Sequence, residues 1–148
     1  MAFINDNDYS VLVRNEIKSI LQENYTETKL RSAENMAIAQ VKNYLKGRYD
    51  VEAIFSEAAP EEPEDEDNRN HHIVMITLDC ALYHLYTSTV PKRMPEIRSL
   101  RYQDALNWLR DVGKGDVTAD LPVIKDDEGN DMLGFKFSSK YPKDDHKW

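Results

Sequence analysis

Cys80 and His84 are the pair with the clearest capacity for chemistry, because they lie four positions apart and would share one face of a helix. A thiolate and an imidazole at this spacing could begin a metal site, with Asp79 as a neighbouring ligand. Zinc sites usually have three or four protein ligands, and the sequence contains no second pair at a recognisable spacing. The alternative interpretation is a core cysteine, poorly reactive in apolar surroundings, beside a hydrogen-bonded histidine.

The other groups that could bind ions are better explained as solvated segments. His71 and His72 are adjacent, so on a helix their side chains would diverge by about 100°, which indicates a polar helix start rather than a metal or pH-sensing pair. The acidic residues of 57–70 and of 126–131 lack the regular ligand spacing of a calcium loop. No Gly-rich phosphate loop or paired Cys motif is present, so we expect neither an enzyme nor a cofactor.

The composition indicates one globular, acidic domain. The 148 residues are 41% hydrophobic, enough for a packed core, and the formal net charge is −8. This charge disfavours tight nucleic-acid binding, which draws most of its affinity from Lys and Arg. With Cys80 as the only cysteine, no disulfide can form within the chain. Without a signal peptide or a membrane-length apolar run, we expect a soluble protein made in the cytoplasm.

Helical periodicity appears in four segments, at about 8–23, from Thr26 or Thr28 to Tyr49, at 71–88 and at 96–112. The third is apolar almost all round, so we expect it at the centre of the core. The residues expected to face inward in the other three are Tyr9, Leu12, Val13, Ile17, Ile20 and Leu21, then Leu30, Ala33, Ala37, Val41, Tyr44 and Leu45, then Ile97, Tyr102, Ala105, Leu106, Leu109 and Val112. Small side chains in the second, Ala33, Ala37 and Ala39, would let another helix approach closely.

Two segments differ from this helical pattern. Residues 57–70 hold seven acids and two prolines, which predicts an exposed, mobile loop between the second and third helices. After Gly113 and Gly115, which are expected to end the fourth helix, two short apolar runs at 121–125 and 132–138 flank a turn signal. The prediction is therefore a mainly α, four-helix bundle-like domain over 1–115, followed over 116–148 by a C-terminal arm that forms a β-hairpin or is extended.

Three local motifs carry a resemblance to a known family. Their residues are Tyr44, Arg48 and Tyr49 in the second helix, Tyr83 and Tyr86 in the third, and Arg101, Tyr102 and Trp108 in the fourth. In this order and spacing, the chain resembles the head–tail connector (adaptor) proteins of Mu-like and other long-tailed bacteriophages. The acidic loop 57–70 and the last 26 residues depart from the family pattern.

The resemblance implies a structural protein without catalytic activity, located at the head–tail junction of the virion. Such proteins form a ring, often twelve-fold, beneath the portal protein, and join it to a tail-completion or tail-terminator protein around a channel for DNA. An aromatic set in the arm is the candidate subunit or partner interface: Phe135, Phe137, Tyr141 and Trp148. The alternatives are a helical protein-interaction domain unrelated to virions and a small metal-binding protein or metal-dependent enzyme around Cys80 and His84.

Overall fold

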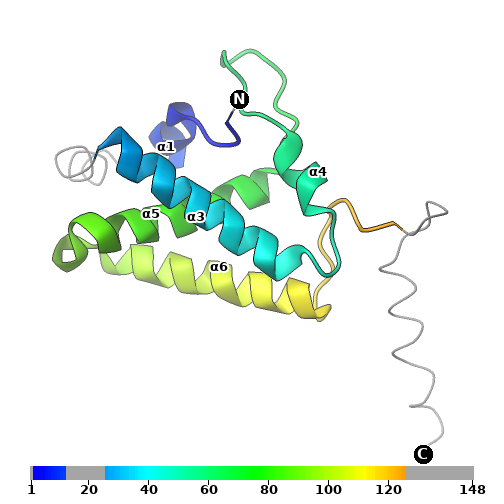
Figure 1. The fold of residues 1–148 in the computed structure, drawn as a ribbon. Coiled ribbons are helices and arrows are strands. Elements are labelled where there is room, and N and C mark those ends of the chain that lie inside the picture. The colour runs from blue at the N-terminus through cyan, green and yellow to red at the C-terminus, as the bar shows by residue number, and fades with distance from the viewer. Residues whose placement is uncertain (1, 13–25, 126–148) are drawn as a thin grey trace, which may run out of the picture.

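Three long helices form the body of the protein (Figure 1). The computed structural model describes residues 2–12 and 26–125. Its elements are α1 (Asp6–Leu12), α3 (Glu27–Leu45), α4 (Val51–Ser56), α5 (His71–Thr89), the 3₁₀ helix η1 (Pro91–Arg93) and α6 (Glu96–Lys114). Helices α5 and α6 are joined by the η1 turn and run side by side, and α3 packs against both. The predicted mainly α, bundle-like domain is confirmed.

Side-chain caps define where the helices begin. Asn5 and Asp8 cap α1 reciprocally, since the main-chain N–H of each donates to the side-chain oxygen of the other, at 2.9 and 3.2 Å. Thr26 and Asn70 each accept from the N–H three residues later, at 3.2 and 3.1 Å, and so start α3 and α5. The predicted cap at Thr26 is confirmed, and α1 begins at Asp6, slightly before the expected residue.

The rest of the predicted first helix lies outside the described residues. This applies to residues 13–25 and hence to the expected core positions Val13, Ile17, Ile20 and Leu21. Tyr9, the first expected core residue of this segment, is described, and it is buried.

Helix α3 ends earlier than predicted. The N–H groups of Arg48 and Tyr49 both donate to the carbonyl of Leu45, and the chain turns there instead of continuing to Tyr49. A further helix that the sequence did not predict, α4, follows at once, capped by Asp50 through a 3.1 Å bond from the N–H of Ala53. The physical reason is long-range, because the main chain on either side of Tyr49 pairs with the segment around Val123. The N–H of Asp50 donates to the carbonyl of Pro122 at 2.9 Å, and the carbonyl of Arg48 accepts from the N–H of Ile124 at 3.2 Å.

Helix α5 is the centre of the core, as predicted. It contributes more buried side chains than any other described helix: Ile73, Val74, Ile76, Thr77, Leu78, Asp79, Cys80, Ala81, Leu82, Leu85 and Tyr86. Ala33 and Ala37 of α3 are buried, whereas Ala39 is exposed and takes no part in helix packing. Among the described residues, no helix has both the length and the apolarity needed to cross a bilayer.

Two predictions about α6 are wrong, one on which residues face inward and one on where the helix ends. Ile97 was expected to face inward but is 50% exposed, and Arg98 is buried in its place because it pairs with Asp79 of α5. Gly113 lies within the helix rather than ending it, and a Cβ there would overlap the carbonyl of Tyr44. The helix ends at Gly115, whose φ of 89° is a left-handed conformation that suits glycine.

Candidate functional site

Two of the motif tyrosines meet in a polar and aromatic cluster that joins all three long helices. The rings of Tyr83 (α5) and Tyr102 (α6) stack with centroids 3.9 Å apart and planes 4° from parallel. Gln40 of α3 donates to the Tyr102 hydroxyl at 3.0 Å and lies 2.8 Å from Nε2 of His84. Burial lowers the pKa of His84, so at neutral pH its neutral ring donates to Gln40. His84 is therefore a hydrogen-bonded histidine at the edge of the core.

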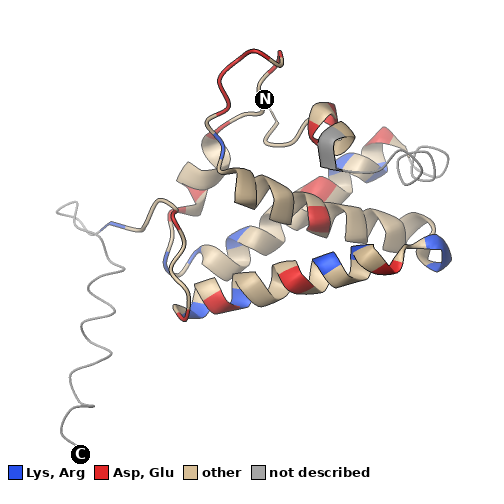
Figure 2. Ribbon diagram, turned by 180° about the vertical axis from the view of Figure 1, so that it is seen from behind, with Lys and Arg blue, Asp and Glu red and all other residues tan. Residues whose placement is uncertain are grey.

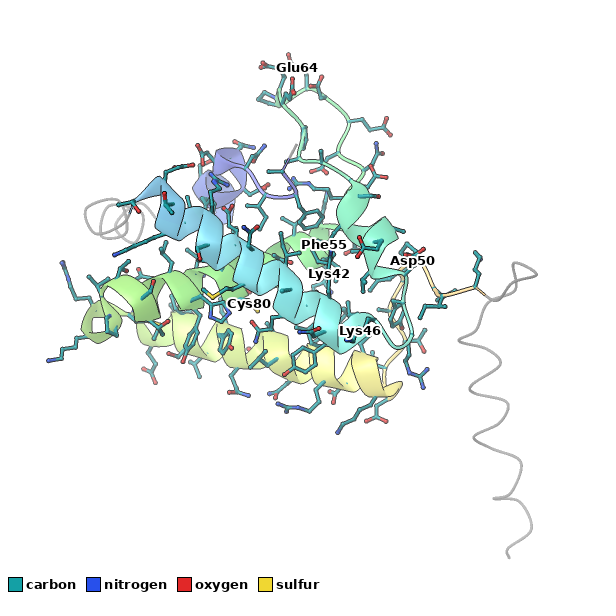
Figure 3. The ribbon with its side chains drawn as sticks, in the orientation of Figure 1. Lys42, Lys46, Asp50, Phe55, Glu64 and Cys80 are labelled. Carbon is teal, nitrogen blue, oxygen red and sulfur yellow. The ribbon has the colours of Figure 1, made fainter. Side chains whose placement is uncertain are left out.

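Cys80 is enclosed in the core and is far from being a reactive thiolate. Its side chain is fully buried, and Figure 3 shows it inside the helical bundle. Burial, together with the nearby charge of Asp79, raises the pKa of the thiol to about 12. Within the described ranges, no group of three or more His, Cys, Asp or Glu side chains is placed to hold a metal ion. Cys80 is therefore a buried residue of the core.

Asp79 links α5 to α6 through charged hydrogen bonds. Its buried Oδ1 accepts from Nε of Arg101 at 3.0 Å and from Nη1 of Arg98 at 3.4 Å. The bond to Asp79 raises the pKa of Arg101. The motif arginine of α6 thus neutralises a buried carboxylate. Trp108, further along α6, packs edge-on against His72, with ring centroids 4.4 Å apart.

Tyr86 is the motif tyrosine that is buried without a hydrogen bond. Its side chain is fully buried, and among the described atoms its hydroxyl has no hydrogen-bond partner. Burial raises its pKa, an effect that the positive charges of Arg98 and Arg93 partly offset. Tyr86 is therefore a core residue near the end of α5.

Arg48 and Tyr49, from the motif at the end of α3, hold the segment 119–125 that follows α6. The hydroxyl of buried Tyr49 accepts from the N–H of Ala119 at 3.0 Å, and the carbonyl of Arg48 accepts from the N–H of Ile124 at 3.2 Å. Arg48 also donates through Nη2 to the carbonyl of Lys114 at 3.4 Å. The motif thus fixes the place where the chain leaves the helices toward residue 126. Motif residue Tyr44 is half-buried in the preceding turn of α3.

An ion network at the other end of the protein was not predicted. Arg69 has a side chain only 4% exposed, and it donates to both oxygens of Asp8, at 2.8 and 3.0 Å. It also bonds both oxygens of Asp67, at 2.8 and 2.9 Å, and the carbonyl of Phe3 at 2.7 Å. Because Arg69 binds it, the pKa of Asp67 is lowered to about 2. This network fastens the start of the chain to the end of the acidic loop.

The acidic loop is consequently exposed only in part. Residues 61–66 are solvent-exposed as expected, and Figure 3 shows Glu64 at the outer tip. The expectation is wrong at Ala59 and Arg69, which are buried. Main-chain and side-chain bonds explain this, since the N–H of Ala59 donates to the carbonyl of Ala2 at 2.9 Å and Asn5 donates to the carbonyl of Pro60 at 2.9 Å. The one arginine among seven acids was the sequence signal for this network.

A pocket of about 540 Å³ lies between this loop, the start of α1 and the first turns of α5. Val74 and Met75 contribute apolar surface, and the carboxylates of Glu61, Glu62 and Asp65 stand around it. His71, at the start of α5, also lines the pocket and approaches Asp67 at 3.3 Å. The pocket therefore combines an apolar wall with an acidic rim.

The predicted interface residues of the arm, Phe135, Phe137, Tyr141 and Trp148, lie outside the described residues, as does most of the predicted hairpin. Of that hairpin, 121–125 is described, and there Val123 pairs with Tyr49 in an isolated bridge.

A family model described as Bacteriophage Mu, Gp36 matches residues 3–133, which include all three motifs and the acidic loop. The match ends before Phe135, so the four arm aromatics lie beyond it. Searches of curated proteins and of solved structures returned no match.

Proposed function

The chain belongs to the family described as Bacteriophage Mu, Gp36, and from this premise we propose that it is a structural phage protein, a head–tail connector (adaptor) in the virion. In this role it forms a ring, expected to be twelve-fold, beneath the portal protein. The ring joins the portal to a tail-completion or tail-terminator protein and leaves a channel for DNA. The match over residues 3–133 is the observation that carries the proposal.

The side chains that could do chemistry contact other residues of the same protein, which supports a scaffold role. Arg101 neutralises Asp79, His84 bonds Gln40, and Cys80 is enclosed by core residues. Each of these contacts stabilises the packing of α5 against a neighbouring helix. We therefore propose a protein without catalytic activity or cofactor, whose function lies in its contacts with other proteins.

The charge of the chain suits a protein that surrounds DNA without gripping it. A formal net charge of −8 repels phosphates, so DNA would slide past rather than stick. In this proposal, DNA passes through the ring with no specific contact to a base.

The arm is the proposed contact with a neighbouring subunit or with the portal. Its aromatic residues Phe135 and Phe137 alternate along the sequence, a pattern suited to strand addition or to anchoring in an apolar groove. The described structure supports a fixed starting point for this arm, because the N–H of Asp50 donates to the carbonyl of Pro122 at 2.9 Å.

Removal of the gene from the phage genome that encodes the chain tests the proposal. We expect lysates to contain separate heads and tails in electron micrographs, and a plasmid copy of the gene to restore joined particles. Mass spectrometry of purified virions should find the chain in a fixed ratio to the portal protein. Joined, infectious particles without the chain would contradict the proposal and favour a helical interaction protein that acts outside the virion.

A truncation tests the arm, and the structure decides where to cut. Leu121 is buried in the core, so a deletion from residue 120 would damage the helical domain as well. A chain that ends at Lys125 keeps these contacts and should stay folded by circular dichroism while failing to restore joined particles. Phe135→Ser/Phe137→Ser in the full chain should fail likewise, and Lys136→Ser is the matched control. Full restoration by the truncated chain would refute the arm contact.

A further inference from the structure

The turn between α5 and α6 carries an apolar and basic surface, which we call the α5–α6 corner and which consists of Lys92, Arg93, Ile97 and Leu100. Ile97 and Leu100 lie one helical turn apart on α6 and are 50% and 54% exposed. Lys92 and Arg93 of η1 are exposed beside them, and neither forms an ion pair with a carboxylate of residues 2–12 or 26–125. Even with the exposed Glu96 nearby, the corner carries a net positive charge.

The pocket at the other end of α5 has the complementary character. Its wall holds the apolar side chains of Val74 and Met75, and its rim holds Glu61, Glu62 and Asp65. Arg69 is the arginine that lines the pocket, and its guanidinium is already bonded to Asp8 and Asp67. Among the described residues no cation pairs with the three rim carboxylates, so the rim keeps its negative charge.

The corner and the pocket of one molecule cannot meet. Val74 lies near the start of α5 and Thr89 at its end, and at 1.5 Å per residue they are roughly 22 Å apart. Figure 2 shows the red acidic loop and the blue turn after α5 well separated. Any contact between these surfaces therefore joins two molecules.

We propose that the α5–α6 corner of one copy docks in the acidic pocket of a second copy. Ile97 and Leu100 cover the apolar wall, while Lys92 and Arg93 meet the rim carboxylates. Different patches meet in this contact, so it is heterologous and repeats from copy to copy, closing into a ring or extending as a filament. As the subunit contact of a connector ring it rests on the proposed function, whereas the docking itself is testable with the purified chain alone.

A charge-exchange experiment with the full-length chain tests the docking. Sedimentation velocity at low salt should show self-association of the wild type that weakens as salt rises. Lys92→Glu/Arg93→Glu makes both surfaces acidic, and Glu61→Lys/Glu62→Lys makes both basic, so each variant alone should associate at least about tenfold more weakly. An equimolar mixture of the two should recover association, because each acidic surface then faces a basic one.

Two further variants separate the docking from general charge effects. Arg110→Glu/Lys114→Glu makes the same change in net charge at the far end of α6, and it should associate as the wild type does. Ile97→Ser/Leu100→Ser should weaken association while keeping its salt dependence. Circular dichroism of each variant verifies that the helices are retained. If Lys92→Glu/Arg93→Glu unfolds, Lys92→Gln/Arg93→Gln takes its place in the experiment.

Some results would overturn the inference. A wild type that stays monomeric at every salt and protein concentration, charge variants that associate normally, or a mixture that gains nothing would each refute the docking. If the gene deletion abolishes joined particles while the mixture fails, the docking is wrong and the connector proposal stands. If the mixture recovers association while virions lack the chain, the docking stands and the connector proposal fails.

Discussion

Replacement of Arg69 by methionine should be among the most damaging single changes in the described part of the protein. Methionine keeps the apolar stem of the side chain but removes the guanidinium that bonds Asp8, Asp67 and the carbonyl of Phe3. Two carboxylates then remain without their cation, one of them buried. The change should loosen the start of the chain and the end of the acidic loop together.

The expected loss in the free energy of unfolding is about 3–5 kcal/mol at pH 7, the usual cost of leaving a buried charge unpaired. Asp67 provides an internal comparison. Its pKa falls from an ordinary 3.8 to about 2, which corresponds to about 2–3 kcal/mol at roughly 1.4 kcal/mol per pKa unit. Because this pKa is depressed, the contribution is present above about pH 4 and disappears as pH falls toward 2.

Urea unfolding followed by circular dichroism at pH 7 and at pH 3 measures the effect. The difference between the wild type and Arg69→Met should shrink at pH 3, because protonation removes unpaired charge from the variant and lowers the contribution of Asp67 in the wild type. Arg110→Met is the matched control: Arg110 is exposed, bonds Asn107 at 3.2 Å, and should change stability by less than about 0.5 kcal/mol. Asp8→Asn added to Arg69→Met should recover part of the loss.

A loss below about 1 kcal/mol for Arg69→Met at pH 7 would refute this reasoning, provided that the urea dependence stays that of the wild type. So would a difference between the two proteins that grows on acidification. Either result would mean that Asp8 and Asp67 reach water or another cation easily.

Other contacts lead to further predictions. Gly113→Ala should lower the free energy of unfolding, measured in urea, by about 1–3 kcal/mol, because the new Cβ meets the carbonyl of Tyr44. This cost should exceed the gain from the better helix propensity of alanine, and a more stable variant would show that α3 and α6 can separate freely. Tyr49→Phe should cost about 1 kcal/mol and speed amide hydrogen exchange at Ala119, and unchanged exchange there would count against the contact. Cys80, with its pKa raised to about 12, should resist thiol reagents at pH 8 until urea unfolds the chain, whereas rapid labelling of the native protein would contradict its burial.

The long helices were predictable because their signals are local. Apolar residues at helical spacing mark the buried faces, and Asn5 and Thr26 supply cap oxygens immediately before the first turns. The continuous apolarity of 71–88 predicted a central helix, which the structure confirms as α5.

The features that escaped prediction depend on residues far apart in the chain. Helix α3 stops at Leu45 because Tyr49 pairs with Val123, and no pattern around Tyr49 reveals that partner. Arg98 is buried and Ile97 is exposed because Arg98 pairs with the buried Asp79 of α5. Helical periodicity alone predicts the opposite, since it assigns isoleucine rather than arginine to the buried face. Chemistry-bearing residue types were found from the sequence, but which of them meet was set by tertiary packing.

The apolar surface of α5 has a consequence for how the chain is made. Helix α6, which covers one side of α5, follows it in the sequence, so a growing chain exposes that side until about residue 114 has emerged from the ribosome. While α5 has emerged and α6 is still inside the ribosome, synthesis has already passed Lys114, so a pause late in translation would leave an aggregation-prone intermediate. We expect synonymous changes that slow translation beyond Lys125 to reduce the yield of soluble chain, while the same changes before His71 leave it unaltered.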